Sequence, residues 1–240
     1  MLDFIRKKWG VPIRDIWFTN THEAVDFSFI NIAYNFYKPI VDERGIILKK
    51  WQSQTLVSDI SKTPEEILAN FKSRLRNKIR RATREGITVK VFESREILKN
   101  NIISEFDAAY MEMYYDKGQK GKSIAHRLYG IAKVGKLVIS IAYLPDGTIA
   151  AYHSYVIGEK IARLLHTVSV FREEPEKKMM IGWANRLLHF KDMCSLRERG
   201  VSFYDWGGVS RDKKMENITR FKEEFNGQEH KTFYSVIIRG

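Results

Sequence analysis

The sequence contains almost no cysteine and no long apolar run. Cys194 is the single cysteine among the 240 residues, so the chain cannot form an internal disulfide, and a reducing compartment is indicated. No apolar segment approaches the ~20 residues of a membrane-spanning helix, and no apolar signal-peptide core follows the basic residues near Met1. These absences predict a cytoplasmic protein without a membrane-spanning segment.

The signatures of several common site types are also missing. The sequence has no P-loop, no dinucleotide-binding glycine fingerprint and no Ser-His-Asp order. Its histidines do not fall at metal-ligand spacings with acidic residues, and a single cysteine cannot supply a zinc site. The sequence therefore predicts no metal site.

The charge of the chain is strongly one-sided. The formal net charge is +12 and the isoelectric point is about 9.6. Such an excess of positive charge favours an anionic partner: nucleic acid, a phosphorylated small molecule or an acidic membrane surface. The excess charge alone also raises solubility. The hydrophobic fraction of 44% is ordinary for a globular protein and excludes wholesale disorder.

One helix is predicted from Pro64 to Glu85. Thr63 supplies an N-cap, proline follows it, and Glu66 completes a capping box. Apolar residues then recur at three- and four-residue spacing until Gly86 ends the helix. The rest of this helix is strongly basic, with no acidic residue between positions 72 and 84. Its seven basic residues there are Lys72, Arg74, Arg76, Lys78, Arg80, Arg81 and Arg84. This surface is either a solvated helix face or a docking surface for phosphate.

The other segments alternate between strands and helices. Residues 1–60 are β-rich, with strands predicted within 24–37 and at 54–60. From residue 87 the order is β-α-α-β-β-β-α-β-α-β. The predicted strands span 87–92, 137–144, 148–157, 161–171, 202–206 and 231–238, and the predicted helices span 95–116, 123–134, 179–199 and a segment beginning near Glu216. This order predicts an α/β (α+β) fold with a mixed sheet, in which a β-rich layer of residues 1–60 packs on a domain of residues 61–240.

A pair of glycines follows the strand at 202–206. In Asp205-Trp206-Gly207-Gly208, two adjacent glycines let the backbone turn sharply, or let a ligand approach where a Cβ would block it. A charged loop and a helix come next, and this helix places Arg220 and Lys222 beside the turn. The stretch is either a site at the carboxyl end of a strand or a tight turn with a hydrophobic plug.

The order of elements resembles the GNAT acyltransferase fold, and two stretches resemble its FemABX-like branch. One is the basic helix that leads into a strand, RLRNKIRRATREGITVKV, and the other is YDWGG followed by RFKEEFNG. The resemblance extends from about Gln54 to the C-terminus, and family members often have two such domains where this chain has room for one. It implies an N-acyltransferase that moves an acyl or aminoacyl group to an amine of a cell-envelope precursor, such as an amino sugar or a peptidoglycan peptide.

The resemblance also places the acyl donor against the strand at 161–171, where Thr167 and Val168 are the predicted contacts. GNAT enzymes that use coenzyme A usually have a glycine-rich turn before the next helix, but here the stretch is EPEKKMMIGWANR, with Gly182 alone. Lys177 and Lys178, at the start of that helix, would bind phosphate through charge and helix dipole together. The donor stays open between an acyl-CoA thioester, which we favour, aminoacyl-tRNA and an acyl carrier protein thioester.

Acyl transfer to an amine needs a proton acceptor and a donor for the carbonyl oxygen. Lys222 matches the lysine of the family's Phe-Lys motif, so the resemblance implies a role near the transferred acyl group or an acceptor phosphate. His166, His153 and Asp205 are candidate bases. The alternative for each histidine is a core or sheet residue, and the alternatives for Asp205 are to orient the acceptor or to close the glycine turn. Two tyrosines, Tyr152 and Tyr204, are hydroxyl donors or packing residues.

The predicted acceptor is a phosphorylated or nucleotide-linked envelope precursor, and tRNA is a second partner class. The residues predicted to bind the substrate are Gly207, Gly208, Arg220, Tyr152, Arg74, Lys78 and Arg81. Two other functions stay open: a nucleic-acid-binding module that tracks phosphates along the basic helix 72–84, and an acyltransferase fold that only binds a partner. The aromatic residues do not alternate with the arginines as stacking platforms would, which argues against the first. The oligomeric state does not follow from the sequence.

Overall fold

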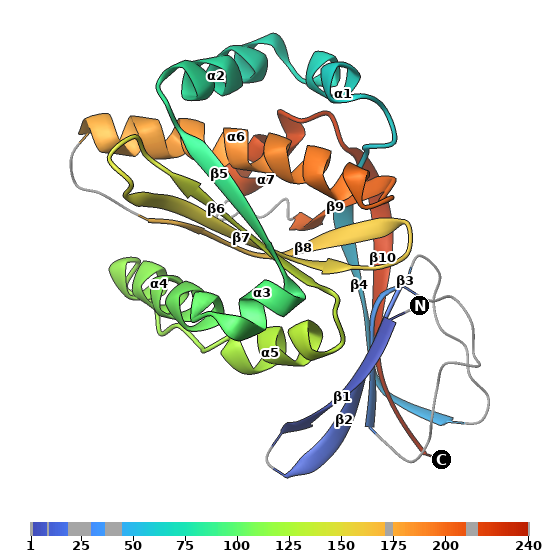
Figure 1. The fold of residues 1–240 in the computed structure, drawn as a ribbon. Helices are drawn as coiled ribbons and strands as arrows, with labels where there is room; N and C mark the ends of the chain where they lie inside the picture. Colours follow the sequence, from blue (N-terminus) through green and yellow to red (C-terminus); the bar gives the residue numbers. More distant parts are fainter. Residues whose placement is uncertain are drawn as a thin grey trace. The chain divides into compact units, whose positions relative to one another are not determined.

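The computed structural model describes residues 2–8, 10–18, 30–36, 45–170, 175–209 and 216–239. The chain divides into two compact units (Figure 1). The terminal unit comprises Met1–Val57, Asp205–Glu223 and Gly227–Gly240, and the central unit comprises Ser58–Tyr204 and Glu224–Asn226. The β-rich N-terminal segment therefore shares its unit with residues from the C-terminal part of the chain.

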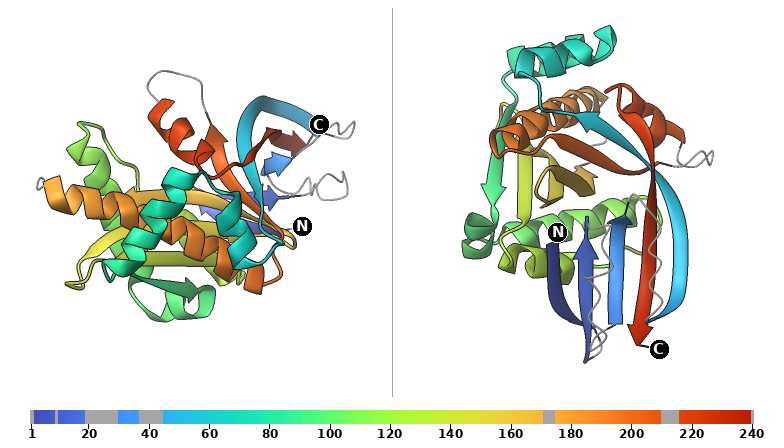
Figure 2. Two further views of the ribbon diagram at one scale, coloured as in Figure 1. Left: turned by 90° about the horizontal axis from the view of Figure 1, so that it is seen from above. Right: turned by 90° about the vertical axis from the view of Figure 1, so that its right-hand side faces the viewer.

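The central unit is built on antiparallel strands in the order β8-β7-β6-β5. These strands are β5 (Thr88–Glu93), β6 (Leu137–Tyr143), β7 (Ile149–Ile157) and β8 (Ile161–Ser169). Helices cover both faces, with α3 (Ser94–Lys99), α4 (Ile102–Asp116) and α5 (Ala125–Lys133) on one side and α6 (Pro175–Glu198) on the other (Figures 1 and 2). Cover on both faces explains why the apolar sequence of β6 is buried at nearly every position.

The terminal unit is a second group of strands in the order β1-β2-β3-β10-β4-β9. They are β1 (Leu2–Lys8), β2 (Val11–Trp17), β3 (Ile30–Phe36), β10 (Gln228–Arg239), β4 (Gly45–Asp59) and β9 (Phe203–Val209), and α7 (Glu216–Glu223) follows β9. The last two residues of β4 and the first two of β9, which include Tyr204, belong to the central unit. Strands β2 and β3 are parallel, whereas β10 is antiparallel to both of its neighbours. The core of this unit contains Ile16, Ala33 and Ile237. The mixed pairing confirms the predicted α/β fold class with a mixed sheet.

Parts of some predicted elements lie outside the described residues. This applies to residues 24–29 and 37 of one predicted strand, to residue 171 of another and to residues 210–215 of the charged loop. Among the helices of the described ranges, none combines the length and the apolar character needed to cross a membrane.

The predicted single helix from Pro64 to Glu85 is wrong, because the structure has two helices there. Helix α1 (Pro64–Asn70) begins with the predicted capping box at Thr63, and α2 (Ser73–Arg84) follows after an extended Phe71 with ψ of 154°. The Phe71 side chain is 2% exposed and packs edge-on against Phe190 and Phe225. Tertiary packing of this ring therefore replaces a continuous helix at the break.

Backbone partners support the same break. The N–H of Lys72 donates to the carbonyl oxygen of Glu224 at 3.3 Å, and the amide nitrogen of the Asn226 side chain donates to the carbonyl oxygen of Asn70 at 2.5 Å. Both bonds satisfy backbone groups that a continuous helix would have used internally. They come from residues 224–226, which no local pattern around residue 71 reveals.

The predicted helix 95–116 is also divided. It forms α3 and α4, separated by an extended Asn100 with φ of −123° and ψ of 166°. The side-chain amide of Asn100 donates to the carbonyl oxygen of Glu96 at 2.8 Å and so ends α3. Asparagine competes in this way with the helical hydrogen bonds of the backbone.

Candidate functional site

The glycine pair of the terminal unit forms a turn that a buried carboxylate closes. Gly207 has φ of +74°, a conformation that favours glycine. Asp205 is fully buried, and its Oδ1 accepts a hydrogen bond from the N–H of Gly207 at 2.9 Å. The hydroxyl of Thr55 on β4 hydrogen-bonds to the same Oδ1 and lies 2.7 Å from the carbonyl oxygen of Gly207. Of the two roles predicted for Asp205, the structure shows the closing of the turn; a catalytic role stays a prediction.

Lys222 lies against the second glycine of the turn. Its Nζ donates to the carbonyl oxygen of Gly208 at 2.8 Å, which links α7 to the end of β9. On the same helix, Arg220 forms an ion pair with Glu216 at 2.5 Å, and both side chains are exposed. Asp205, Gly207, Gly208 and Lys222 thus lie together in the structure, and their part in catalysis or substrate binding stays a prediction.

A cavity of about 350 Å³ lies in the same unit. It is lined by Gln54, Val209, Glu216, Thr219, Arg220, Glu223 and Glu229. Arg220 is the predicted substrate-binding residue in this lining, and the three carboxylates were not predicted. Within the described part of the chain, the carboxylate of Glu223 has no hydrogen bond or ion pair with another residue. A carboxylate in this position attracts a protonated amine and accepts a proton from it.

In the central unit, His166 is a neutral histidine in the middle of β8. Its ring lies edge-on to Tyr110 at 5.2 Å, and its Nε2 has no hydrogen-bond partner among the described residues. Burial, with the positive charge of Arg127 second, lowers the pKa of His166 to about 4. At neutral pH the imidazole is therefore uncharged and a weak base. It stays a predicted catalytic residue.

The other residues predicted on or beside β8 are mostly in the core. Val168 is 1% exposed and pairs with Tyr152 across β7 and β8, whereas Thr167 is half-buried. The Tyr152 ring stacks on Phe106 at 5.3 Å, and burial, with Glu105 second, raises the pKa of Tyr152 to about 12. Tyr152 thus packs under α4, as one of its two sequence interpretations expected.

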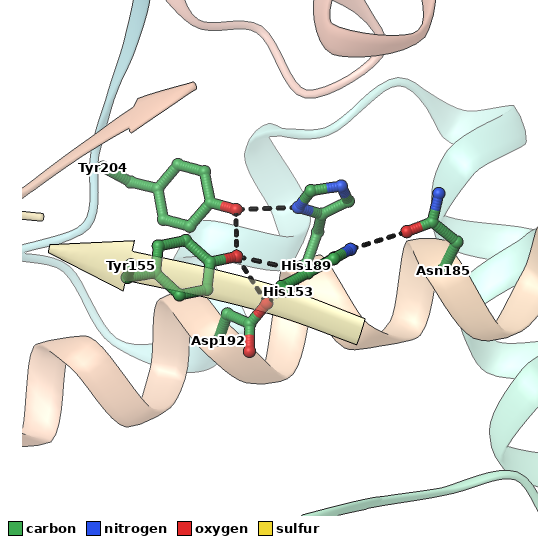
Figure 3. A network of polar contacts seen from close by, with 6 residues as sticks. All are labelled: His153, Tyr155, Asn185, His189, Asp192 and Tyr204. Atoms are coloured by element: carbon green, nitrogen blue, oxygen red, sulfur yellow. Dashed lines mark hydrogen bonds and ion pairs between the residues drawn. The ribbon is translucent and has the colours of Figure 1, made fainter. Parts of the chain in front are cut away.

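A buried polar network was not predicted as a unit (Figure 3). It consists of His153 and Tyr155 from β7, Asn185, His189 and Asp192 from α6, and Tyr204 from β9. All of these except Asn185 are almost fully buried. A signal was available, since residues 185, 189 and 192 recur at helical spacing and form one polar stripe on α6.

The proton positions in this network follow from donor and acceptor chemistry. The Tyr155 hydroxyl donates to Oδ2 of Asp192 at 2.6 Å. Because Tyr155 has one proton, Tyr204 must donate to Tyr155 across their 2.6 Å contact, and His189 Nδ1 must donate to Tyr204 at 2.7 Å. The network therefore forms a directed chain of hydrogen bonds from His189 to Asp192.

Three members of the network are also metal-ligand types. Ligand atoms of His153, His189 and Asp192 lie within 4.8 Å of one another, a grouping that the sequence prediction of no metal site did not anticipate. Both nitrogens of His153 already have partners at 2.7 Å, in Asp192 Oδ2 and Asn185 Oδ1. Both His153 nitrogens, their partner oxygens and His189 Nδ1 therefore already form hydrogen bonds within the network. We interpret the three residues as part of a hydrogen-bonded network that supports the core.

The basic helix does not present its cations as one surface. Arg76 donates to the carbonyl oxygen of Phe71 at 2.6 Å, and Lys78 lies 3.9 Å from Glu224. Arg81 stacks over the Trp183 ring at 4.2 Å and pairs with Glu85. Arg74 is exposed. Of the predicted phosphate-binding residues, Lys78 and Arg81 thus have internal partners.

Comparison with known proteins identifies the fold. No protein-family model and no curated protein matches the chain. Solved structures do match. FemX aligns with 85% of this chain and 65% of its own, at 14% identity and a TM-score of 0.62. The chain thus covers just under two thirds of FemX. A domain assigned to the C-terminal part of a lysylphosphatidylglycerol synthetase from Agrobacterium fabrum aligns with 98% of this chain and 80% of its own, at 15% identity and a TM-score of 0.60.

A third structure agrees with these two. L-PGS from Bacillus licheniformis aligns with 87% of this chain and 68% of its own, at 14% identity and a TM-score of 0.51. The protein has a GNAT-like fold of the FemX type. This finding confirms the resemblance that the basic helix and the YDWGG stretch carried.

Within the FemX-type fold, the predicted donor site falls on β8 and the start of α6. Lys177 and Lys178 lie in the first turn of α6, where Lys177 is half-buried and Lys178 is exposed. A helix N-terminus with two lysines provides positive charge for phosphate without a glycine-rich turn. These residues therefore have the chemistry to bind a phosphate-bearing acyl donor, and the contact itself stays a prediction.

Proposed function

We propose that this protein is an N-acyltransferase that moves an acyl or aminoacyl group from an activated carrier to an amine. The FemX-type fold supports the class of reaction. The observation that carries the proposal is the Lys222 ammonium held 2.8 Å from the carbonyl oxygen of Gly208, in the unit that also contains the carboxylate-lined cavity. Together they supply a cation and proton acceptors, which acyl transfer to an amine requires.

In the proposed reaction, the acceptor enters the cavity as an ammonium ion. A carboxylate of the cavity takes one proton from it, and the neutral amine that results is a nucleophile. The amine nitrogen then attacks the carbonyl carbon of the acyl carrier. The new C–N bond forms, the bond to the carrier sulfur breaks, and the proton that the nitrogen loses as it becomes an amide passes to the leaving thiolate. Lys222 stabilises the negative charge that develops on the carbonyl oxygen.

For the substrates, we propose an acyl-CoA thioester as donor and a phosphorylated or nucleotide-linked cell-envelope precursor as acceptor. The lysines in the first turn of α6 support a donor with phosphate groups. The three glutamates of the cavity support an acceptor that arrives as an ammonium ion, as an amino sugar or a peptide side chain does.

A second candidate is the transfer of an aminoacyl group from aminoacyl-tRNA. The observation that favours it is the fold likeness to a domain of lysylphosphatidylglycerol synthetase, whose name denotes the joining of lysine to phosphatidylglycerol. In this case tRNA replaces the thioester as the activated carrier. The first turn of α6 would then contact the phosphates of the tRNA acceptor end.

The test is a thermal titration of the purified protein with acetyl-CoA and longer acyl-CoAs, because a ligand that binds only the folded state raises the melting temperature. Release of free thiol in the presence of amino sugars is measured in parallel, with wild type and Lys222→Ala side by side. We expect one thioester to raise the melting temperature of both proteins and to be consumed by the wild type. A flat response to every thioester removes the coenzyme A proposal and directs the assay to charged tRNA. Equal turnover by both proteins removes the role of Lys222.

A further inference from the structure

The outer side of the central unit contains a groove of about 500 Å³ between α1, α2 and α6. It is lined by Leu68, Asn77, Ile79, Arg80, Thr83, Arg84 and Phe190. In Figure 1, α1 and α2 form the outermost layer on this face of the unit. The groove is of the size of a small-molecule site.

Two arginines line this groove without an internal partner. The side chains of Arg80 and Arg84 make no hydrogen bond or ion pair with another described residue, and both residues are exposed. They lie four residues apart on α2, which places them one turn apart on the same side of the helix. Like charges at this spacing destabilise a helix unless an anion lies between them. Lys72 and Arg74 are exposed too, but Arg80 and Arg84 are the two cations of α2 that line the groove, so an anion in the groove would bind this pair.

The floor of the groove is apolar. Leu68, Ile79 and Phe190 line it, and Phe190 is fixed edge-on to the buried Phe71 ring at 6.2 Å. Next to the two guanidinium groups, Asn77 and Thr83 provide uncharged polar atoms. No described residue that lines the groove is acidic. The lining thus combines two guanidinium groups, which suit phosphate, with apolar side chains.

We propose that this groove binds a nucleotide, with its phosphates on Arg80 and Arg84 and its base against Phe190. Two guanidinium groups match one or two phosphates. An extended nucleic-acid backbone would need several more cations along one track, but Arg76, Lys78 and Arg81 have partners within the central unit, and the exposed Lys72 and Arg74 do not line the groove. The inference goes beyond the proposed acyltransferase function and does not depend on it.

The experiment is isothermal titration calorimetry of the full chain with ADP, UDP, inorganic phosphate and a short RNA hairpin. The test variant is Arg80→Gln/Arg84→Gln. Its control is Arg95→Gln/Lys99→Gln, which removes the same charge from exposed positions on α3. We expect a nucleoside diphosphate to bind the wild type and the control with equal affinity. Its affinity for the test variant should be about 100-fold lower, because each lost charged hydrogen bond lowers the affinity by about tenfold.

Phe190→Leu tests the aromatic contact. It should weaken nucleotide binding several-fold and leave the affinity for inorganic phosphate unchanged. Lys222→Ala should bind nucleotides like the wild type, so that a failed acyltransferase and a failed nucleotide site give different results. The proposal is overturned if neither diphosphate binds the wild type, or if the α3 control loses as much affinity as the test variant. Tighter binding of the RNA hairpin, with a steep salt dependence, overturns it in favour of a polynucleotide surface.

Discussion

The ammonium of Lys222 donates a hydrogen bond to the carbonyl oxygen of Gly208, which lies fourteen residues earlier in the chain. A lysine side chain is flexible, and this bond holds its charge at the backbone of the glycine turn. The lysine of the RFKEEFNG stretch and the second glycine of the YDWGG stretch are therefore parts of one arrangement.

Replacing Lys222 with methionine keeps the length of the side chain and removes the charge. If the ammonium stabilises the oxyanion, the rate of acyl transfer should fall by about 100-fold. The melting temperature should change little, because Lys222 is only half-buried. Steady-state rates at saturating donor and a thermal melt measure the two effects, and Lys222→Arg, which keeps the charge, should recover part of the rate. A methionine variant with the wild-type rate would contradict the role.

The two glycines of the turn should respond differently to alanine. Gly207 has φ of +74°, so Gly207→Ala should reduce the free energy of unfolding by about 1–2 kcal/mol. A Cβ on Gly208 would lie 3.7 Å from the Ser53 hydroxyl, which is ordinary contact, so Gly208→Ala should change stability by less than about 0.5 kcal/mol. Urea denaturation of both variants measures the difference. Equal losses would mean that the turn does not require its left-handed conformation.

Thr55 contacts both the carboxylate and the carbonyl oxygen of the turn from a position 150 residues away from Asp205. Thr55→Val removes the hydroxyl at constant shape and leaves buried acceptors with one donor fewer. We expect it to destabilise the protein by about 1–3 kcal/mol, whereas Thr55→Ser, which keeps the hydroxyl, should lose clearly less. Chemical denaturation measures both. A valine variant as stable as the serine variant would show that the hydroxyl is not needed to satisfy Asp205.

The lowered pKa of His166 predicts a pH dependence of stability. The folded protein binds this proton only near pH 4, whereas the unfolded chain binds it near the ordinary value of 6.5. The unfolded state therefore carries more protons between these values, so the contribution is complete above pH 6.5 and is lost as the pH falls toward 4, by at most about 3 kcal/mol.

Urea unfolding between pH 4 and pH 7 tests this dependence. The His166→Gln variant should lose less stability than the wild type on acidification, since its carboxylates titrate as before and the histidine does not. The matched control is His126→Gln, which removes an exposed histidine and leaves His166 in place, so the pH dependence that belongs to His166 should remain. Parallel curves for wild type and His166→Gln would show that His166 titrates normally.

The break between α1 and α2 depends on the Phe71 side chain. Phe71→Ala removes a ring that is 2% exposed and packed against two phenylalanines, and it should destabilise the protein by about 3–5 kcal/mol. Phe203, which is 44% exposed, is the control, and Phe203→Ala should cost less than about 1 kcal/mol. Thermal unfolding of the two variants measures this contrast. Similar losses would mean that Phe71 does not anchor the helices.

Much of the fold followed from local patterns. The capping box at Thr63 is present as predicted, and the strands that become β5 to β8 were recognised from short apolar runs bounded by turn residues. The meeting of Asp205, Gly207 and Lys222 was also predicted, because a glycine pair followed by a short helix leaves few geometric choices. These features depend on neighbours within about twenty residues in the chain.

The partners of those residues were not predictable in the same way. Thr55 has the pattern of an ordinary strand residue, and its contact with Asp205 exists because β4 and β9 are adjacent in one sheet. The stripe of residues 185, 189 and 192 was visible on the predicted helix, but its meaning depends on Tyr155 and Tyr204 from two separate strands. The carboxylates of the cavity come from β10 and α7, whose pairing no spacing shows.

The sequence by itself determined the fold class, the strands β5 to β8 and the turn at Gly207, since these depend on backbone conformation and on apolar periodicity over short ranges. The tertiary structure decided which cations are available to a ligand and which side chains become proton acceptors. It also divided the basic helix, because the buried Phe71 ring and the hydrogen bonds from Glu224 and Asn226 stabilise the break. Burial and charge pairing are properties of residues brought together from distant parts of the chain, and only the folded structure defines them.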